Sequence, residues 1–253
     1  MVQLDPLDGR DFVAREFAAG TFEPALMRIF PILLATMRKG DGFVDIGANS
    51  GLYSLLAAEA RQDIGIDAFE PWPPAVDALR HNLALNNCAG RVTVHEVALG
   101  EYPGSADLYL PATNHGLLDS SASLQSNFHH APRACLSVRV ARLDDIKLAE
   151  SPGLIKADIE GAEPAMIAGG MKTLALSRPL IVLEVIPPTD LQRLEEQRRA
   201  LEYVDIRLQP EAVIVGQAVS FDQHAWNHLW VPSRWLHGFL PVLADNGWRI
   251  QVD

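Results

Sequence analysis

One short segment constrains the fold of this chain more than any other, the stretch Val44-Asp45-Ile46-Gly47-Ala48-Asn49-Ser50-Gly51. An apolar strand at 43–46 runs into a turn that contains two glycines, and an apolar helix begins directly after it. A strand, a glycine turn and a helix N-terminus place free backbone N–H groups at the carboxyl end of the strand. The segment therefore predicts a nucleotide-type cofactor site in an α/β fold.

From residue 43 onwards, short apolar strands alternate with helices, which is typical of βαβ units and a parallel sheet. The predicted strands are 43–46, 64–69, 92–97, 154–158, 180–185, 203–208 and 228–231. The predicted helices are 51–60, 74–86, 162–175 and 189–201. A further strand pair is expected at 105–110 and 136–143. The polar connection between them, 111–134, is long enough to act as a lid-like loop.

The two ends of the chain are predicted to be helical. Apolar residues recur at helical spacing within 10–38, and Pro31 should break or kink that helix. After Pro232, aromatic and aliphatic residues predict one more amphipathic helix. We therefore divide the chain into an N-terminal helical cap (1–40), a cofactor-binding domain (41–232) and a C-terminal helical extension (233–253).

Charge and cysteine content exclude several classes of function. The formal net charge is −11, which disfavours nucleic acid as a partner because phosphate binding needs clustered Lys and Arg. Cys88 and Cys135 are too few for a disulfide scaffold and indicate reduced thiols. No apolar run is long enough to span a bilayer, and no signal-peptide pattern precedes the first helix. We expect a cytoplasmic protein with no membrane partner.

Two carboxylates indicate which cofactor the glycine turn accepts. The spacing is Gly-x-x-x-Gly, whereas nicotinamide enzymes use Gly-x-Gly-x-x-Gly. Asp45, beside the turn, would repel a pyrophosphate but suits the ammonium group of a methionine tail. Glu70 ends the next strand, where an acid can accept hydrogen bonds from both hydroxyls of an adenosine ribose. The pair favours S-adenosylmethionine over NAD(P).

Several ordered segments carry a resemblance to a known family. They are Val44–Ser54, Ala68–Pro71, Asn82-x-x-x-Asn86-Asn87, Val97–Gly100, Ile155–Glu163 and Arg178–Glu184. Together they resemble the FkbM family of S-adenosylmethionine-dependent methyltransferases over roughly residues 40–232. The resemblance implies the class I methyltransferase fold, an α/β Rossmann-like seven-stranded sheet of order 3-2-1-4-5-7-6 with strand 7 antiparallel and helices on both faces. It also implies O-methylation of a hydroxyl on a sugar or other natural product.

The turn, the following strands and the resemblance together give a set of expected cofactor-binding residues. These are Asp45, Gly47, Ala48, Asn49, Gly51, Tyr53, Glu70, Pro71, Val97, Ala98 and Ser121. Val97 and Ala98 are expected to line the adenine slot. Ser121 belongs to a loop pattern with Asn114 and Ser120 that some members of the family share, although here the spacing is one residue longer.

Carboxylates gather where the methyl group should be transferred. Asp158 ends the fourth strand, Glu160 and Glu163 follow it, and Glu184 ends the fifth strand. The carboxyl ends of parallel strands meet at one edge, so these acids should supply a general base or hold a divalent cation. We assign Asp158, Glu160 and Glu184 as catalytic and Glu163 as charge at a helix terminus. For Asp158 the alternative is a helix N-cap.

Other readings of the site stay open. No His-Glu-x-x-His or paired-cysteine spacing is present, so no metal ligands are assigned, and Mg²⁺ is left as a further cofactor to test. Three histidines in the long loop are candidate bases, although surface exposure is the commoner fate of such residues. The expected partner is a small hydroxylated acceptor, with a homodimer as a second expectation. The alternatives are an NAD(P)-dependent oxidoreductase and a non-catalytic S-adenosylmethionine-binding protein.

Overall fold

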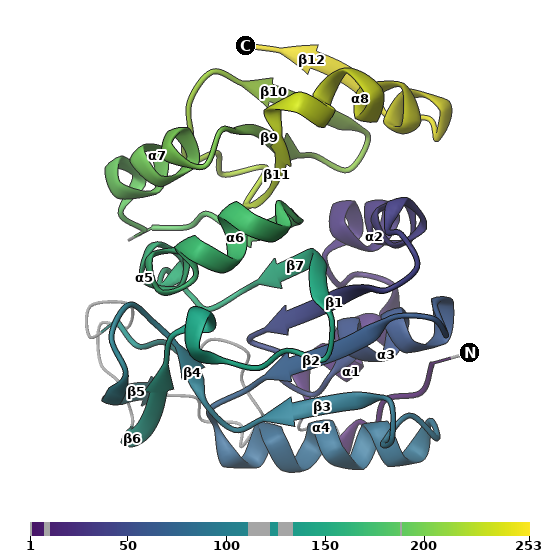
Figure 1. The fold of residues 1–253 in the computed structure, drawn as a ribbon. Coiled ribbons are helices and arrows are strands. Elements are labelled where there is room, and N and C mark those ends of the chain that lie inside the picture. The colour runs from purple at the N-terminus through teal and green to yellow at the C-terminus, as the bar shows by residue number, and fades with distance from the viewer. Residues whose placement is uncertain (1, 8–10, 111–121, 126–133, 188) are drawn as a thin grey trace.

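The computed structural model describes residues 2–7, 11–110, 122–125, 134–187 and 189–253 (Figure 1). Most of the predicted lid-like loop 111–134, with Ser121 and the three loop histidines, therefore lies outside the described residues. All other segments that carry the predicted site are described.

A mixed sheet of nine strands forms the centre of the molecule, in the order β12-β10-β9-β11-β8-β7-β1-β2-β3. Its strands are β1 (Asp41–Ile46), β2 (Gly65–Phe69), β3 (Val92–His95), β7 (Ser151–Ala157), β8 (Leu180–Glu184), β9 (Tyr203–Leu208), β10 (Ala212–Gly216), β11 (Asn227–Pro232) and β12 (Arg249–Val252). Strands β3, β2, β1, β7 and β8 pair in parallel, and β11 runs antiparallel to both β8 and β9. This confirms the expected seven-strand order with its antiparallel strand.

Two further strands extend the sheet beyond the seven expected. Strand β10 pairs antiparallel with β9, and the backbone N–H of Gln209 donates to the carbonyl of Ala212 at 2.9 Å across their turn. Strand β12 pairs in parallel with β10 after helix α8 (Leu236–Asp245). The C-terminal segment is therefore a helix followed by a sheet strand. We missed β12 because four exposed residues give almost no burial pattern.

Helices cover both faces of the sheet, as the alternating pattern predicted (Figure 1). They are α1 (Phe12–Ala19), α2 (Pro24–Thr36), α3 (Leu52–Ala60), α4 (Pro73–Leu85), α5 (Glu163–Gly169), α6 (Met171–Ser177), α7 (Leu191–Ala200) and α8. Apolar residues of α2, α3, α4 and α8 share one buried cluster with one face of the sheet. Those of α5, α6 and α7 share another with the opposite face.

Two expectations about helix continuity were wrong. The single helix expected at 162–175 is two short helices that meet at Gly169 and Gly170. A Cβ atom on Gly169 would lie 2.0 Å from the carbonyl oxygen of Gly100, so the chain approaches there too closely for any side chain. Pro31 does not end α2; the N-terminal helical run instead breaks at Gly20, with φ of 71°.

A second, three-stranded sheet lies beside the main one, in the order β4-β6-β5. It comprises β4 (Ala98–Leu99), β5 (Gly104–Leu110) and β6 (Ala134–Ala141). The antiparallel pairing of β5 with β6 confirms the expected strand pair. The strand expected at 92–97 ends at His95 in the main sheet, and the separate strand β4 that follows it pairs with β6. A small apolar cluster under this second sheet contacts Trp72.

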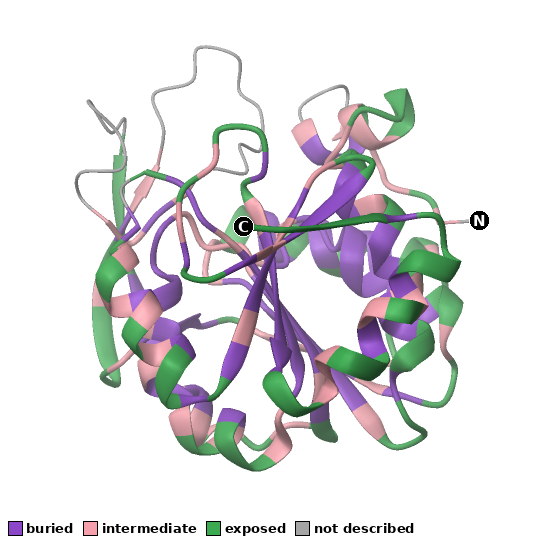
Figure 2. Cartoon of the chain, turned by 90° about the horizontal axis from the view of Figure 1, so that it is seen from above, coloured by how far each residue is buried: buried purple, intermediate pink, exposed green. Residues whose placement is uncertain are grey.

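Helix α2 packs into the core, and α1 buries Val13 and Ala14. Leu26, Ile29 and Leu33 of α2 have no exposed surface, and Phe30 is 1% exposed. Figure 2 shows the same pattern, with buried strands and helix faces turned inward and exposed faces outward. Within the described part of the chain, no single helix is long and apolar enough to cross a membrane; α1 and α2 together pass by length and composition, with a bend of 87° between them.

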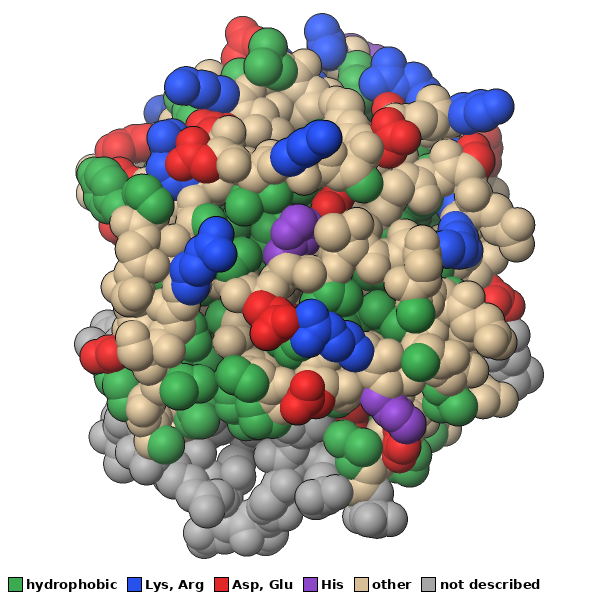
Figure 3. Space-filling view, turned by 60° about the horizontal axis from the view of Figure 1, so that its bottom comes forward, with side chains coloured by type: hydrophobic (Ala, Val, Ile, Leu, Met, Phe, Trp, Pro, Cys, Tyr) green, Lys and Arg blue, Asp and Glu red, His purple; other side chains and the backbone are tan. Residues whose placement is uncertain are grey.

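Charged side chains of both signs are mixed over the face drawn in Figure 3. Lys and Arg lie singly or in small groups between Asp and Glu, with hydrophobic side chains between them. Among the described residues on this face, positive charge forms no continuous stripe of the kind that follows a nucleic-acid backbone.

Candidate functional site

The glycine turn after β1 joins three strand ends. The backbone N–H groups of Gly47 and Ala48 both donate to the carbonyl of Phe69 at the end of β2, each at 3.0 Å. Gly47 has φ of +75°, and a Cβ atom there would lie 2.0 Å from the carbonyl oxygen of Asp158 after β7. Only glycine fits this position, because both the backbone conformation and the close approach exclude a side chain.

Glu70 lies in the position predicted for a ribose-binding acid. Its Oε2 accepts from the backbone N–H of Asn49 at 2.9 Å, and its Oε1 accepts from that of Trp72 at 2.9 Å. These bonds fix the carboxylate and leave further lone pairs on both oxygens for two ribose hydroxyls. Burial raises the pKa of Glu70 to about 7, against the lowering effect of the two backbone donors.

A pocket opens at this edge, beside Glu70. Six of the predicted cofactor residues line it: Gly47, Asn49, Glu70, Pro71, Val97 and Ala98. Trp72, Leu108 and Leu124 complete an apolar slot, which the sequence analysis did not assign. A mostly apolar lining with two convergent acids, Glu70 and Asp158, is typical of a small-ligand site. The pocket suits an adenosyl group with its ribose at Glu70.

Four other predicted cofactor residues lie behind the turn and do not line this pocket. Asp45 is buried, and its Oδ2 accepts from the Ser54 hydroxyl at 2.7 Å. Ala48 is buried, and a Cβ atom on Gly51 would lie 2.4 Å from the Leu79 side chain. The spacing in the sequence placed these residues in the motif but did not show which side of the turn they occupy.

Tyr53, the fourth of these residues, takes part in a charged network. Its ring lies 4.8 Å from Lys156 Nζ, and Lys156 Nζ bonds Asp158 Oδ2 at 3.0 Å. Burial alone would lower the pKa of Lys156, but the nearby carboxylates of Asp158, Glu23 and Asp45 raise it above its usual value. Lys156 is therefore a charged partner for the surrounding acids.

A second pocket adjoins the first, and Asp158 lines both. Its cavity volume is about 690 Å³, and it extends from the three predicted catalytic acids to the turn between α1 and α2. Its lining also includes Trp226 and Asn227, at the start of β11. The shared position of Asp158 makes this second pocket the candidate acceptor site.

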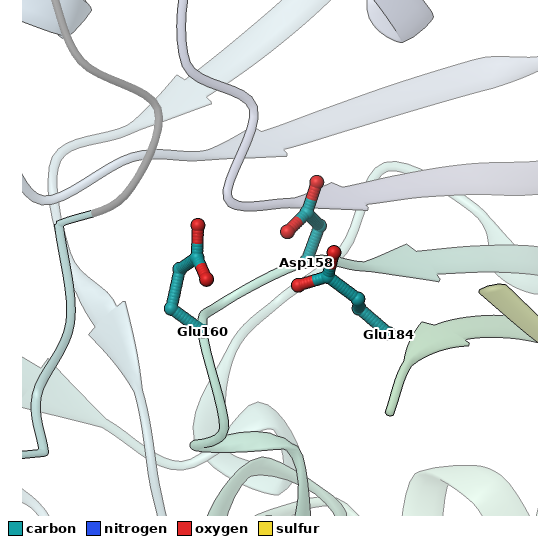
Figure 4. Close-up of side chains that lie close together, drawn as sticks. All are labelled: Asp158, Glu160 and Glu184. Atoms are coloured by element: carbon teal, nitrogen blue, oxygen red, sulfur yellow. The ribbon is translucent and has the colours of Figure 1, made fainter. Parts of the chain in front are cut away.

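Asp158, Glu160 and Glu184 come together as predicted. Figure 4 shows their carboxylates turned toward one another, and one oxygen of each lies within 4.8 Å of the others. Glu184 Oε2 is buried without a hydrogen-bond partner. Burial, followed by the negative charges of Asp158 and Glu160, raises the pKa of Glu184 well above its usual value. Such a trio of oxygen ligands can hold a proton or a divalent cation.

The alternative reading of Asp158 as a helix N-cap is wrong. Helix α5 begins at Glu163, with Ala162 before it, so Asp158 lies outside the cap position. Glu163 is buried in the first turn of α5, and its Oε1 accepts from the backbone N–H of Ile159 at 3.0 Å. Glu163 lies at the helix terminus as expected, but its burial raises its pKa, so it holds the turn that carries Asp158 and Glu160 and does not act as terminal charge.

Sequence reasoning missed Glu23, which lines the acceptor pocket from the start of α2. Its Oε2 accepts from the Tyr53 hydroxyl at 2.7 Å, and its Oε1 accepts from Asn227 Nδ2 at 2.9 Å. Burial raises the pKa of this carboxyl, while Lys156 lowers it. The region was expected to be one helical run, so no signal separated Glu23 from its neighbours.

The family of the chain follows from residues 45–208, which match the model of the methyltransferase FkbM domain. The chain belongs to the FkbM family of methyltransferases. It is 30% identical over 179 residues to the 2-O-methyltransferase NoeI of Sinorhizobium fredii, covering 65% of this chain and 72% of that protein. Over 56 residues, 22% of each chain, it is 41% identical to the 31-O-demethyl-FK506 methyltransferase FkbM of Streptomyces tacrolimicus.

Solved structures agree on the fold. The FkbM methyltransferase of Methylobacillus flagellatus superposes with a TM-score of 0.52 at 18% identity, over 90% of this chain and 56% of that one. A ribosomal protein L11 methylase from Lactobacillus delbrueckii gives a TM-score of 0.51 at 14% identity, over 91% and 84%. The present chain thus spans little more than half the length of the Methylobacillus flagellatus protein. The predicted methyltransferase class and class I fold are confirmed.

Proposed function

We propose that this protein transfers the methyl group of S-adenosylmethionine to a hydroxyl oxygen of a small molecule such as a sugar or other natural product. The observation that carries this proposal is the meeting of two pockets at Asp158. One has the apolar slot and ribose-binding acid of an adenosyl site, and the other is a larger cavity edged by carboxylates. A methyl donor and an acceptor bound in these pockets would face each other across Asp158.

The residues present fit this cofactor. Val97 and Ala98 line the apolar slot for the adenine, and Glu70 offers free lone pairs to the ribose hydroxyls. Asp158, at the inner end of the same pocket, is a negative group next to the position of the positively charged sulfonium. The bound cofactor supplies an already activated methyl group and leaves as a neutral thioether.

The protein's own task is to align an acceptor oxygen and to take its proton. Asp158 is the carboxylate common to both pockets, and its bond to Lys156 orients it. We assign Asp158 as the proton acceptor. Glu184, with its raised pKa, carries a proton at neutral pH and can donate a hydrogen bond to a second acceptor oxygen. Glu160 is the third carboxylate of this cluster.

A hydroxyl acceptor is supported by the names of two relatives, a 2-O-methyltransferase and an enzyme for 31-O-demethyl-FK506. Phe12, Phe22 and Trp226 line the second pocket and offer aromatic surface to the face of a ring. We also propose that these three clustered carboxylates, Asp158, Glu160 and Glu184, can bind Mg²⁺, because they provide the oxygen ligands that it prefers. The homodimer and the cytoplasmic location stay predictions from the sequence.

The proposal is tested by incubating the protein with S-adenosylmethionine and a panel of hydroxylated sugars and natural products, and measuring S-adenosylhomocysteine release. Turnover should require an acceptor and should fall at least about 100-fold in Asp158→Ala, while affinity for S-adenosylhomocysteine is largely kept. Paired reactions with magnesium and with a chelator decide metal dependence. A product methylated on nitrogen or carbon, or unchanged turnover in Asp158→Ala, would contradict the assignment.

A further inference from the structure

We propose that Glu23 is a positioning residue, which fastens the turn between α1 and α2 to the reaction edge and so fixes the outer wall of the acceptor pocket. This rests on the proposed function, because the wall matters for catalysis only if the second pocket receives the acceptor. Neither Glu23 nor its partner Asn227 lies within residues 45–208, which match the family model. The wall is thus supplied by segments outside the family domain.

One carboxylate joins three separate elements. Glu23 precedes α2, Tyr53 lies on α3 and Asn227 begins β11. The two hydrogen bonds use both oxygens of the carboxylate, at 2.7 Å to the Tyr53 hydroxyl and 2.9 Å to the Asn227 amide. The side chain is half-buried, so water competes less for these donors than it would at the surface. These two hydrogen bonds therefore depend on the position of the turn between α1 and α2.

The backbone of Glu23 indicates that the side chain holds the turn in place. Its φ and ψ are 37° and 61°, in the left-handed region that residues other than glycine avoid. Glu23 occupies the N-cap position of α2 but makes no side-chain hydrogen bond to that helix. A disfavoured backbone conformation persists only where surrounding contacts determine it. The Glu23 carbonyl accepts from the backbone N–H of Met27 at 2.9 Å, and the contacts of its side chain are those to Tyr53 and Asn227.

The turn and the reaction edge are coupled through Tyr53. Phe22, next to Glu23, lines the acceptor pocket and has its ring centroid 6.5 Å from that of Tyr53. The Tyr53 ring also contacts Lys156, which bonds Asp158. Release of Glu23 should therefore displace Phe22 from the pocket wall while the cofactor pocket, which Glu23 does not line, stays intact.

Two substitutions separate positioning from charge. Glu23→Ala removes both hydrogen bonds. Glu23→Gln removes the negative charge but can keep both bonds, because its amide oxygen accepts from Asn227 and its NH₂ group donates to the Tyr53 hydroxyl, which also accepts. Tyr53→Phe removes one bond and leaves the carboxylate. Glu196→Ala is the matched control, since it removes an exposed carboxylate on α7 that bonds Gln192 and lines neither pocket.

The measurements are hydrogen exchange of the amides in 12–36, calorimetric affinity for S-adenosylhomocysteine, and KM and kcat for the acceptor found in the panel. In Glu23→Ala we expect exchange in this segment to rise about tenfold or more and the acceptor KM to rise about tenfold. S-adenosylhomocysteine affinity should change less than about twofold. Tyr53→Phe should show the same changes to a smaller extent. Glu23→Gln should bring both the exchange rate and the acceptor KM most of the way back to the wild-type values, and the control should match wild type.

Unchanged exchange in a folded Glu23→Ala protein would overturn the proposal. So would a Glu23→Gln protein with wild-type exchange and an acceptor KM as high as that of Glu23→Ala, because charge and not position would then be the cause. If Glu23→Ala does not fold, Tyr53→Phe decides, and wild-type exchange in that variant overturns the proposal. Failure of the proposed function looks different, because wild type itself would then transfer no methyl group to any acceptor.

Discussion

Single residues set the chemistry of the cofactor pocket, and Glu70 is the clearest case. Its carboxylate receives two backbone N–H groups, which would favour the ionised form, yet burial outweighs them and raises its pKa to about 7. A group with this pKa changes charge within the physiological range. Because a ribose donates its hydroxyl hydrogens, the ionised form of Glu70 binds the cofactor better than the protonated form.

Cofactor affinity should therefore depend on pH. As the pH rises from about 6 to about 8, Glu70 loses its proton in the free protein and S-adenosylhomocysteine affinity should increase several-fold. Glu70→Gln should bind more weakly throughout and lack this increase. Calorimetric titrations of both proteins over that range provide the test, since the ligand's own titration is common to both. Parallel pH profiles for the two proteins would contradict it.

How far the sequence predicted these residues depends on how local the signal is. Gly47 and Glu70 were predicted correctly, because a turn and a strand end determine their positions within a few residues. Tyr53 and Asp45 were predicted in the same motif but face away from the pocket, since spacing along the chain does not show which side of a turn a side chain takes. Glu23 depends on contacts with residues 30 and 204 positions away, which no local pattern contains.

Among the elements, the turn from β7 into α5 carries the reaction edge. Its shape depends on Glu163, which is fully buried at the first position of α5 and accepts from Ile159. Burial raises the pKa of Glu163 to about 8. The folded protein consequently binds a proton here that the unfolded chain releases near its ordinary carboxyl pKa.

This proton makes stability decrease as the pH rises. Between the unfolded pKa of about 4.5 and the folded pKa of about 8, the native state binds more protons, so the free energy of unfolding falls with increasing pH. We expect Glu163→Gln, which stays neutral, to lose less stability than wild type over this window, by on the order of 1–3 kcal/mol. Urea unfolding at the two ends of the window measures the difference. An equal loss in both proteins would show that Glu163 is ionised in the fold.

The elements that sequence patterns missed share a physical cause. Strand β12 has four exposed residues, and its position depends on pairing with β10, which a local pattern does not reveal. The division of the expected helix 162–175 reflects the close approach of Gly169 to Gly100, a contact between distant segments. By contrast, the predicted strand 203–208 has the same bounds as β9, because apolar and charged residues alternate in Tyr203–Leu208 and most of them are buried.

At the scale of the whole molecule, the N-terminal helices complete the core on one face of the sheet. Leu26, Ile29, Phe30, Leu33 and Leu34 of α2 belong to the same buried cluster as residues of β1, α3 and α8. Fully burying such a side chain contributes about 1.5–3 kcal/mol. Five together are comparable with the whole stability of a domain, about 5–15 kcal/mol.

Removal of residues 1–37 should therefore abolish cooperative folding and not merely uncover the acceptor pocket. The truncated chain is expected to show no sharp thermal transition and to bind a dye specific for exposed apolar surface. Calorimetry and dye fluorescence of the truncated and full chains would check this. A truncated chain that unfolds cooperatively near the wild-type temperature would mean that the core folds without α1 and α2.

The central claim is that the pocket beside Glu70 binds S-adenosylmethionine. The most direct measurement is calorimetric titration of the full chain with S-adenosylmethionine, S-adenosylhomocysteine and NADH, repeated on Glu70→Ala. The structure predicts one saturable site for the first two ligands, no binding of NADH, and affinity about 10-fold or more weaker in Glu70→Ala, because two hydroxyl bonds to a charged group are lost. Binding of NADH without binding of S-adenosylmethionine would contradict it.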